Sequence, residues 1–230
     1  MENNASVVVL GVTAVVVVLS FIIYKQMAGS TSSDDKSSSD KPKKSEGSKS
    51  EAQKEKYPAG KISIYFGSQT GTAEGFARTL MEEGKTAGFA AKIIDLEDFD
   101  AEVLMNSTER AIFLMATYGE GEPTDNAIAF TKWMKNIEGT LSADCLDKLR
   151  FCVFGLGNKQ YEHYNLMGKT TNTCLSALGA KVIFDYGEGD DDATLEEDFD
   201  AWRAKMWPAL TAMFHPDAAA VEEVTQRARG

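Results

Sequence analysis

Hydroxyl, glycine and aromatic residues are concentrated in three short segments, each of which follows an apolar run. The first segment, residues 67–72, reads Gly-Ser-Gln-Thr-Gly-Thr. Hydroxyls and backbone N–H groups in a glycine-rich turn that opens a helix can bind a phosphate group. No lysine follows Gly71, so this is not an NTPase phosphate loop, and a single phosphomonoester held by neutral donors fits better. The alternative is a Ser/Thr-rich turn that only caps a helix.

The second and third segments, residues 116–125 and 155–165, each place a tyrosine among small or polar residues. Tyr118 and Tyr161 could together enclose a flat heterocycle, although a surface tyrosine in a turn explains the second segment equally well. The third segment begins like a dinucleotide fingerprint, but Gln160 stands where its last glycine should be, so that motif fails. His163 is better explained as a structural hydrogen-bonding residue than as a base.

The elements that must position these segments alternate between short β-rich runs and longer helical patterns. Helical spacing places Ala127, Phe130, Met134 and Ile137 on one face. The same spacing gives a second face to Leu195, Phe199, Trp202 and Met206, after a capping box formed by Thr194 and Glu197. Strands are expected at residues 62–66, 91–95, 111–115, 151–154 and 181–185.

Five strands alternating with helices predict an α/β fold with a doubly wound, five-stranded parallel sheet. Ligands of such sheets bind beyond the carboxyl ends of the strands. The three segments all follow predicted strands, so we expect them to meet at that edge.

A fourth segment, residues 187–192, is acidic, and acids continue at residues 196–198. It is either a solvated turn before a helix N-terminus or a docking face for a basic partner. The chain has a formal net charge of −11, and its acidic excess lies after residue 61. This charge disfavours nucleic acid as a partner.

The first 60 residues differ from the rest. Residues 5–24 contain no charge, and about 20 apolar residues suffice to cross a bilayer. A cleaved signal peptide or a buried core helix is the alternative, but the start lacks basic residues and no small-residue cleavage site follows. We therefore predict a membrane anchor at 5–24, with a lumenal tail at 1–4. The cations that flank it, all on its C-terminal side, place the rest in the cytosol: Lys25, Lys36, Lys41, Lys43 and Lys44.

Residues 25–60 contain Ser, Lys, Asp, Glu and Gly with few apolar side chains, so they predict a flexible linker. The three cysteines are widely spaced, which indicates neither a disulfide framework nor a zinc site. Cys152 lies in an apolar run and is expected in the core.

Four motifs, at residues 68–74, 117–121, 155–163 and 189–199, resemble the flavodoxin-like FMN domain of the diflavin reductases. With the predicted anchor, the resemblance is to their microsomal branch, and it covers residues 61–214. It implies an oxidoreductase of the NADPH–haemoprotein reductase type, located on the endoplasmic reticulum membrane. The protein would be single-pass, with its FMN domain facing the cytosol. FMN would receive electrons from a FAD/NADPH reductase domain and pass them to the basic face of a haem protein such as cytochrome P-450.

The resemblance also implies roles for particular residues, with no catalytic acid, base or metal ligand. Tyr118 and Tyr161 would stack on the two faces of the flavin, the Gly119 peptide would bond flavin N5, and Asp191 would lie at the ring edge. Acidic surroundings would oppose negative charge on the ring and make it a stronger electron donor. The phosphate would be bound by Ser68, Gln69, Thr70, Gly71, Thr72 and Ala73. The flavin would be lined by Ala116, Thr117, Tyr118, Gly119, Leu156, Gly157, Asn158, Lys159, Gln160, Tyr161, Glu162, His163, Tyr164 and Asn165.

The chain departs from that family in length. Diflavin reductases continue with FAD and NADPH sites, whereas this chain stops at Gly230, and residues 215–230 resemble the start of a connector. The FAD and NADPH sites are thus expected only in a C-terminal part that this chain lacks. Two alternatives remain open. One is a self-contained anchored flavodoxin served by a separate reductase, and the other is a non-enzymatic signalling module on the same fold.

Overall fold

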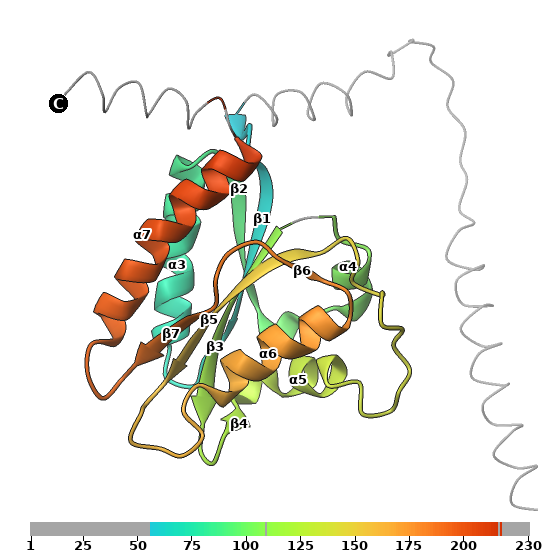
Figure 1. Ribbon diagram of the computed structural model, residues 1–230, viewed down its shortest axis with the longest axis vertical. Coiled ribbons are helices and arrows are strands. Elements are labelled where there is room, and N and C mark those ends of the chain that lie inside the picture. The colour runs from blue at the N-terminus through green and yellow to red at the C-terminus, as the bar shows by residue number, and fades with distance from the viewer. Residues whose placement is uncertain (1–55, 109, 216, 218–230) are drawn as a thin grey trace, which may run out of the picture. The chain divides into compact units, whose positions relative to one another are not determined.

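The computed structural model describes residues 56–108, 110–215 and 217 (Figure 1). The predicted lumenal tail, anchor and most of the linker lie outside these residues, as does nearly all of the predicted connector. Among the helices that are described, none is long and apolar enough to cross a membrane.

A parallel sheet forms the centre of the described domain (Figure 1). Its strand order is β2-β1-β3-β5-β6, with β7 also paired to β5, and each of these pairings is parallel. A short strand, β4, runs antiparallel to the end of β3. The predicted doubly wound parallel sheet is therefore confirmed. The strand bounds are β1 Gly60–Gly67, β2 Phe89–Asp95, β3 Arg110–Tyr118, β4 Glu122–Pro123, β5 Arg150–Gly157, β6 Lys181–Val182 and β7 Gly187–Asp190.

Helices cover both faces of this sheet because the central strands alternate their side chains between two cores. Ile62 and Ile64 of β1 join the core under α3 and α7, whereas Tyr65 joins the core under α5 and α6. Cys152 is fully buried in the first core, as expected. The helices are α3 Thr72–Thr86, α4 Ala101–Met105, α5 Ile128–Met134, α6 Leu166–Ala177 and α7 Leu195–Phe214, with short 3-10 helices η1 Leu96–Asp98 and η2 Asp125–Ala127.

The fifth strand differs from the prediction. Instead of one run at 181–185, the edge consists of β6 and, after an interruption, β7, which was expected to be a loop. Glycines at positions 187 and 189 of β7 allow α7 to pack directly on the backbone of this strand. A Cβ at Gly187 would lie 2.5 Å from both Phe154 Cδ2 and Trp202 Cδ1, so the strand has no side chain there to mark it in the sequence.

Two helix predictions also need correction. The predicted helical face is buried at Ala127 of η2 and at Phe130 and Met134 of α5, but α5 ends at Met134 and Ile137 is 76% exposed. Asn136 ends the helical path, because it adopts a left-handed conformation with φ 47°. In contrast, α7 begins after Thr194 as predicted, yet among the described atoms Thr194 provides no side-chain cap for it.

Candidate functional site

A cleft of about 500 Å³ opens beyond the carboxyl ends of β1, β3 and β5. Its volume lies within the range of about 300–1,000 Å³ that is usual for small-molecule sites. Most predicted site residues line it: Ser68, Gln69, Thr70, Thr72, Ala73, Ala116, Thr117, Tyr118, Gly119, Leu156, Gly157, Asn158, Tyr161, His163, Tyr164, Asn165 and Asp191. The other predicted residues fall outside the lining: Gly71, Lys159, Gln160 and Glu162.

The first segment, residues 67–72, is suited to bind a phosphate group in this cleft. The Ser68 hydroxyl accepts a hydrogen bond from Gly71 N at 3.1 Å, and the hydroxyls of Thr70 and Thr72 lie 3.4 Å apart. Gly71 has φ 92° and leads into α3, whose N-terminus has no side-chain cap among the described residues. Backbone N–H groups of the first turn therefore remain for an anion. Because none of the residues lining the cleft is Lys or Arg, the donors in this segment are neutral.

Gln69 is held differently from the neighbouring hydroxyl residues. Its Nε2 donates to Asp125 Oδ2 at 2.8 Å, and Asp125 N donates back to Gln69 Oε1 at 3.1 Å. The Gln69 side chain thus joins the first segment to residues 124–126, although the residue also lines the cleft.

Two exposed tyrosines also line the cleft. Tyr118 is 52% exposed and Tyr161 is 65% exposed, and both line the cleft. The Tyr118 turn is closed by a hydrogen bond from Gly121 N to Tyr118 O at 3.2 Å. His163 packs against this turn, since a Cβ at Gly121 would lie 2.9 Å from His163 Cβ. The histidine side chain therefore packs against the turn that follows Tyr118.

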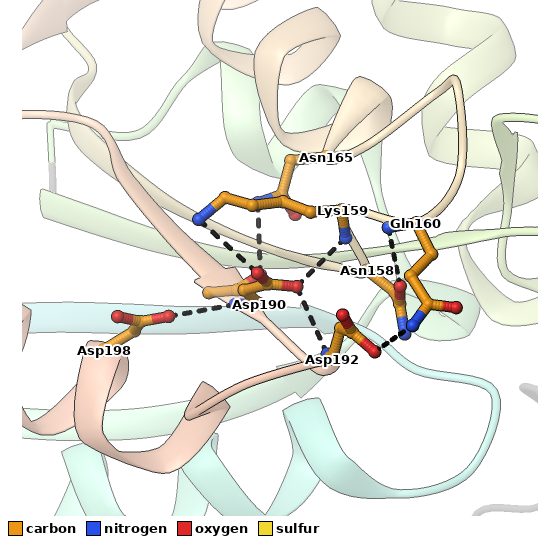
Figure 2. Close-up of polar contacts among 8 residues, drawn as sticks. Asn158, Lys159, Gln160, Asn165, Asp190, Asp192 and Asp198 are labelled. Carbon is orange, nitrogen blue, oxygen red and sulfur yellow. Dashed lines mark hydrogen bonds and ion pairs between the residues drawn. The ribbon is translucent and has the colours of Figure 1, made fainter.

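The segment that bears Tyr161 is tied to the end of β7 (Figure 2). Asp190 Oδ1 accepts from Lys159 N at 3.0 Å and from Asp192 N at 3.2 Å. These backbone bonds, that of Lys159 first, and the nearby Lys159 ammonium lower the pKa of the Asp190 carboxyl. The Gln160 amide is hydrogen-bonded to Asp192. Both Lys159 and Gln160 thus use their side chains on the acidic segment, which explains why they do not line the cleft.

Tyr164 and Asn165 are the last two residues of the third segment, and both line the cleft. Asn165 is fully buried with φ 54°, and its Nδ2 donates to Gly189 O at 3.2 Å. Its Oδ1 has no partner among the described atoms and lies against the backbone of Gly157, where a Cβ would come within 2.8 Å of it. Burial, assisted by nearby carboxylates, raises the pKa of Tyr164 to about 12, so this phenol is neutral at physiological pH.

Three residues that line the cleft were not predicted as site residues. Glu120 and Thr124 belong to the second segment, of which only residues 116–119 were predicted to bind the cofactor. Leu195 was predicted only as part of a helix face. Within the described parts of the chain, no group of His, Cys, Asp and Glu could hold a metal ion.

Comparison with known proteins agrees with this geometry. Residues 64–202 match the flavodoxin family. The chain belongs to the flavodoxin family. It also resembles a solved flavodoxin from Pseudomonas aeruginosa, a cysteine-to-serine mutant, with a TM-score of 0.55 and 26% identity over 66% of this chain and 99% of that one. Oxidised Flavodoxin 1 from Bacillus cereus gives a TM-score of 0.53 at 20% identity, covering 66% of this chain and 97% of that one, and supports the fold alone.

Curated relatives include reductases that are much longer than this chain. It is 47% identical to NADPH–cytochrome P450 reductase of Dictyostelium discoideum over 149 residues, which are 65% of this chain and 22% of the relative. It is 46% identical to the reductase of the same name from Oryctolagus cuniculus over 165 residues, 70% of this chain and 24% of the relative. The matched part is therefore less than a quarter of these two relatives' length.

Family membership indicates FMN as the cofactor, and the cleft fits that molecule. A phosphomonoester suits the uncapped α3 N-terminus and the hydroxyls of the first segment. A flat ring system suits the exposed rings of Tyr118 and Tyr161 in the same cleft.

Proposed function

We propose that this chain is a membrane-anchored FMN domain that transfers electrons from a FAD/NADPH reductase domain to cytochrome P-450 or another haem protein. One observation carries the proposal: a single cleft is lined by uncharged residues of the segment 68–73, here called the phosphate cradle, and by two exposed tyrosines. The 45–47% identity to NADPH–cytochrome P450 reductases supports the assignment to this type of oxidoreductase.

The residues of the chain bind and orient the cofactor. Ser68, Thr70 and Thr72, with the α3 N-terminus, would hold the phosphate. Tyr118 and Tyr161 would hold the ring, while Asp191 and Glu120 place negative charge in the cleft lining. FMN, when bound, supplies one-electron transfer. The two carboxylates oppose further negative charge in the cleft, which favours release of electrons to an acceptor.

The membrane assignment rests on the sequence. Residues 5–24 have no charge, and the lysines that follow favour a cytosolic orientation for the domain. We extend the proposal to a single-pass anchor in the endoplasmic reticulum membrane. Acidic residues at the cleft end of the domain, such as Asp191 and Asp192, suit a basic face on the haem protein.

One observation favours a second candidate. The chain aligns with 99% of the length of a bacterial flavodoxin, so it contains the elements of a self-contained electron carrier. In that case a separate reductase would supply the electrons.

The test is direct electron transfer from the full chain in detergent micelles, loaded with FMN. We expect that NADPH alone does not reduce it, and that the photochemically reduced protein reduces cytochrome c, a basic haem protein. Docking through acidic residues predicts that the rate falls as ionic strength rises. A reduced protein that transfers no electrons to haem at any ionic strength would contradict the electron-transfer proposal. Reduction by an added FAD reductase from an unrelated flavodoxin system would favour the second candidate.

A further inference from the structure

Asn126 uses every hydrogen-bonding position of its side chain to join three separate parts of the fold. Its Nδ2 donates to Phe66 O at 3.2 Å and to Asp95 Oδ1 at 2.8 Å. Its Oδ1 accepts from Ser68 N at 3.0 Å and from the Thr124 hydroxyl at 2.7 Å. An amide has two donor hydrogens and two acceptor lone pairs, so this side chain is fully satisfied.

Two of these bonds hold the start of the phosphate cradle. Phe66 and Ser68 flank Gly67, which lies at the end of β1 and presses against residues 124–127. A Cβ at Gly67 would lie 3.0 Å from both the Thr124 hydroxyl oxygen and Ala127 Cβ. The path of the chain between β1 and α3 is thus set by contact with the segment that contains Asn126.

The other two bonds fix Asn126 itself. Asp95 ends β2, the neighbour of β1, and its Oδ1 also accepts from Glu97 N at 2.8 Å. Thr124 is 1% exposed and follows directly after β4, the strand that closes the Tyr118 turn. Asn126 therefore connects the cradle to the end of β2 through Asp95 and to the β3–β4 hairpin, which bears Tyr118, through Thr124.

Asn126 itself is not among the residues that line the cleft. We infer that it is a positioning residue, which holds the Ser68–Thr72 hydroxyls where they meet the phosphate of FMN and so gives the site its selectivity for the phosphorylated flavin. This inference rests on the proposed function. The hairpin side of the cleft, by contrast, keeps its own closing bond between Gly121 and Tyr118, so binding of the ring depends less on Asn126.

The test compares FMN with riboflavin, which has the same ring and no phosphate. Asn126→Asp keeps the size and acceptor oxygen of the side chain, but it removes both donated bonds and places a carboxylate beside Asp95. Dissociation constants are measured by flavin fluorescence quenching on the flavin-free full chain in detergent micelles. We expect FMN binding to weaken by about tenfold or more and riboflavin binding to change by less than about threefold.

Asn136→Asp is the matched control. Asn136 is another partly buried asparagine that fixes a turn, through two bonds of 3.0 Å to the main chain of Leu141, and it lies outside the cleft lining. We expect this variant to keep the ratio of FMN to riboflavin affinity of the unmodified chain. The inference is overturned if Asn126→Asp weakens both flavins equally, or if it leaves FMN binding unchanged.

A second variant covers the case in which Asn126→Asp does not fold, as judged by circular dichroism. Asp95→Ala removes the carboxylate that accepts from Asn126 Nδ2, and Asp95 lies outside the cleft lining. We expect a smaller loss in the same ratio, and an unchanged ratio would overturn the inference. If the unmodified chain binds neither flavin, the proposed function fails instead, so the two failures are distinguishable.

Discussion

Lys159 contacts Asp190 with both its main chain and its side chain (Figure 2). Its backbone N donates to Asp190 Oδ1 at 3.0 Å, and its Nζ lies 3.4 Å from Oδ2. The Asp190 side chain is only 6% exposed, in contrast to the exposed residues Asp191 and Asp192 that follow it. Asp190 therefore differs in role from its acidic neighbours, because it fixes the segment that bears Tyr161 instead of presenting charge at the surface.

This difference predicts that Asp190→Asn destabilises the fold. The variant loses the ion pair with Lys159 and weakens the bonds from the two backbone N–H groups. We expect thermal unfolding of the full chain in micelles, followed by circular dichroism, to occur several degrees lower. Asp147→Asn, at an exposed position in the turn before β5, is the control and should change the midpoint little. Equal midpoints for the two variants would contradict a structural role for Asp190.

The lowered pKa of Asp190 predicts a specific dependence on pH. Its carboxylate stabilises the fold at pH values above its ordinary pKa of 3.8, and this contribution is lost as pH falls through the lower pKa of the folded state. The difference in unfolding free energy between the unmodified chain and Asp190→Asn should be constant near neutral pH and shrink below about pH 4. Urea titrations of both proteins across that range measure it. A difference that grows on acidification would have the wrong sign.

The sequence predicted the cleft well because it depends on topology. Apolar runs at β1, β3 and β5 are continuous, and a parallel sheet brings their carboxyl ends to one edge. Residues at or just beyond the carboxyl ends of those strands, including Ser68, Tyr118 and Tyr161, therefore line one cleft. For the same reason the fold class followed from the alternation of strands and helices alone.

Features that depend on tertiary contact were missed. The glycines of β7 give no strand signal, because Gly187 is required by the side chains of Phe154 and Trp202 that press on it. The bonds of Asn126 reach Phe66, 60 positions earlier, and local pattern cannot show them. Likewise, Lys159 was predicted to line the cleft, but its main chain and side chain contact Asp190, 31 positions later, and it lies outside the lining.

Gly187→Ala and Gly75→Ala form a matched pair that tests the packing of α7 on β7. The Cβ at Gly187 would clash at 2.5 Å with Phe154 and Trp202, whereas a Cβ at Gly75 in α3 meets no described atom within 4 Å. We expect Gly187→Ala to lose about 1–3 kcal/mol of unfolding free energy. Gly75→Ala should gain about 0.5–1 kcal/mol, since alanine favours a helix. Urea unfolding measures both, and a Gly187→Ala protein as stable as the unmodified chain would refute the packing.

Tyr161→Ala tests binding of the flavin ring in the cleft. Loss of an exposed stacking ring should weaken FMN binding by about 2- to 12-fold, and riboflavin binding by the same factor, because both share the ring. Tyr161→Phe keeps the aromatic face and should bind both flavins nearly normally. Fluorescence titration with each flavin gives the result. A loss of affinity for FMN but not for riboflavin would mean that Tyr161 contributes to binding of the phosphate and not of the ring, which would contradict this prediction.

The central claim is that this cleft holds FMN, and the most direct measurement is the cofactor content of the purified full chain in detergent micelles. The absorption spectrum is recorded, the protein is denatured, and the released flavin is identified and quantified by chromatography. We predict a yellow protein that releases FMN, and not FAD or riboflavin, in a ratio of about one to one with the chain. A colourless protein that also takes up no added FMN would contradict the account.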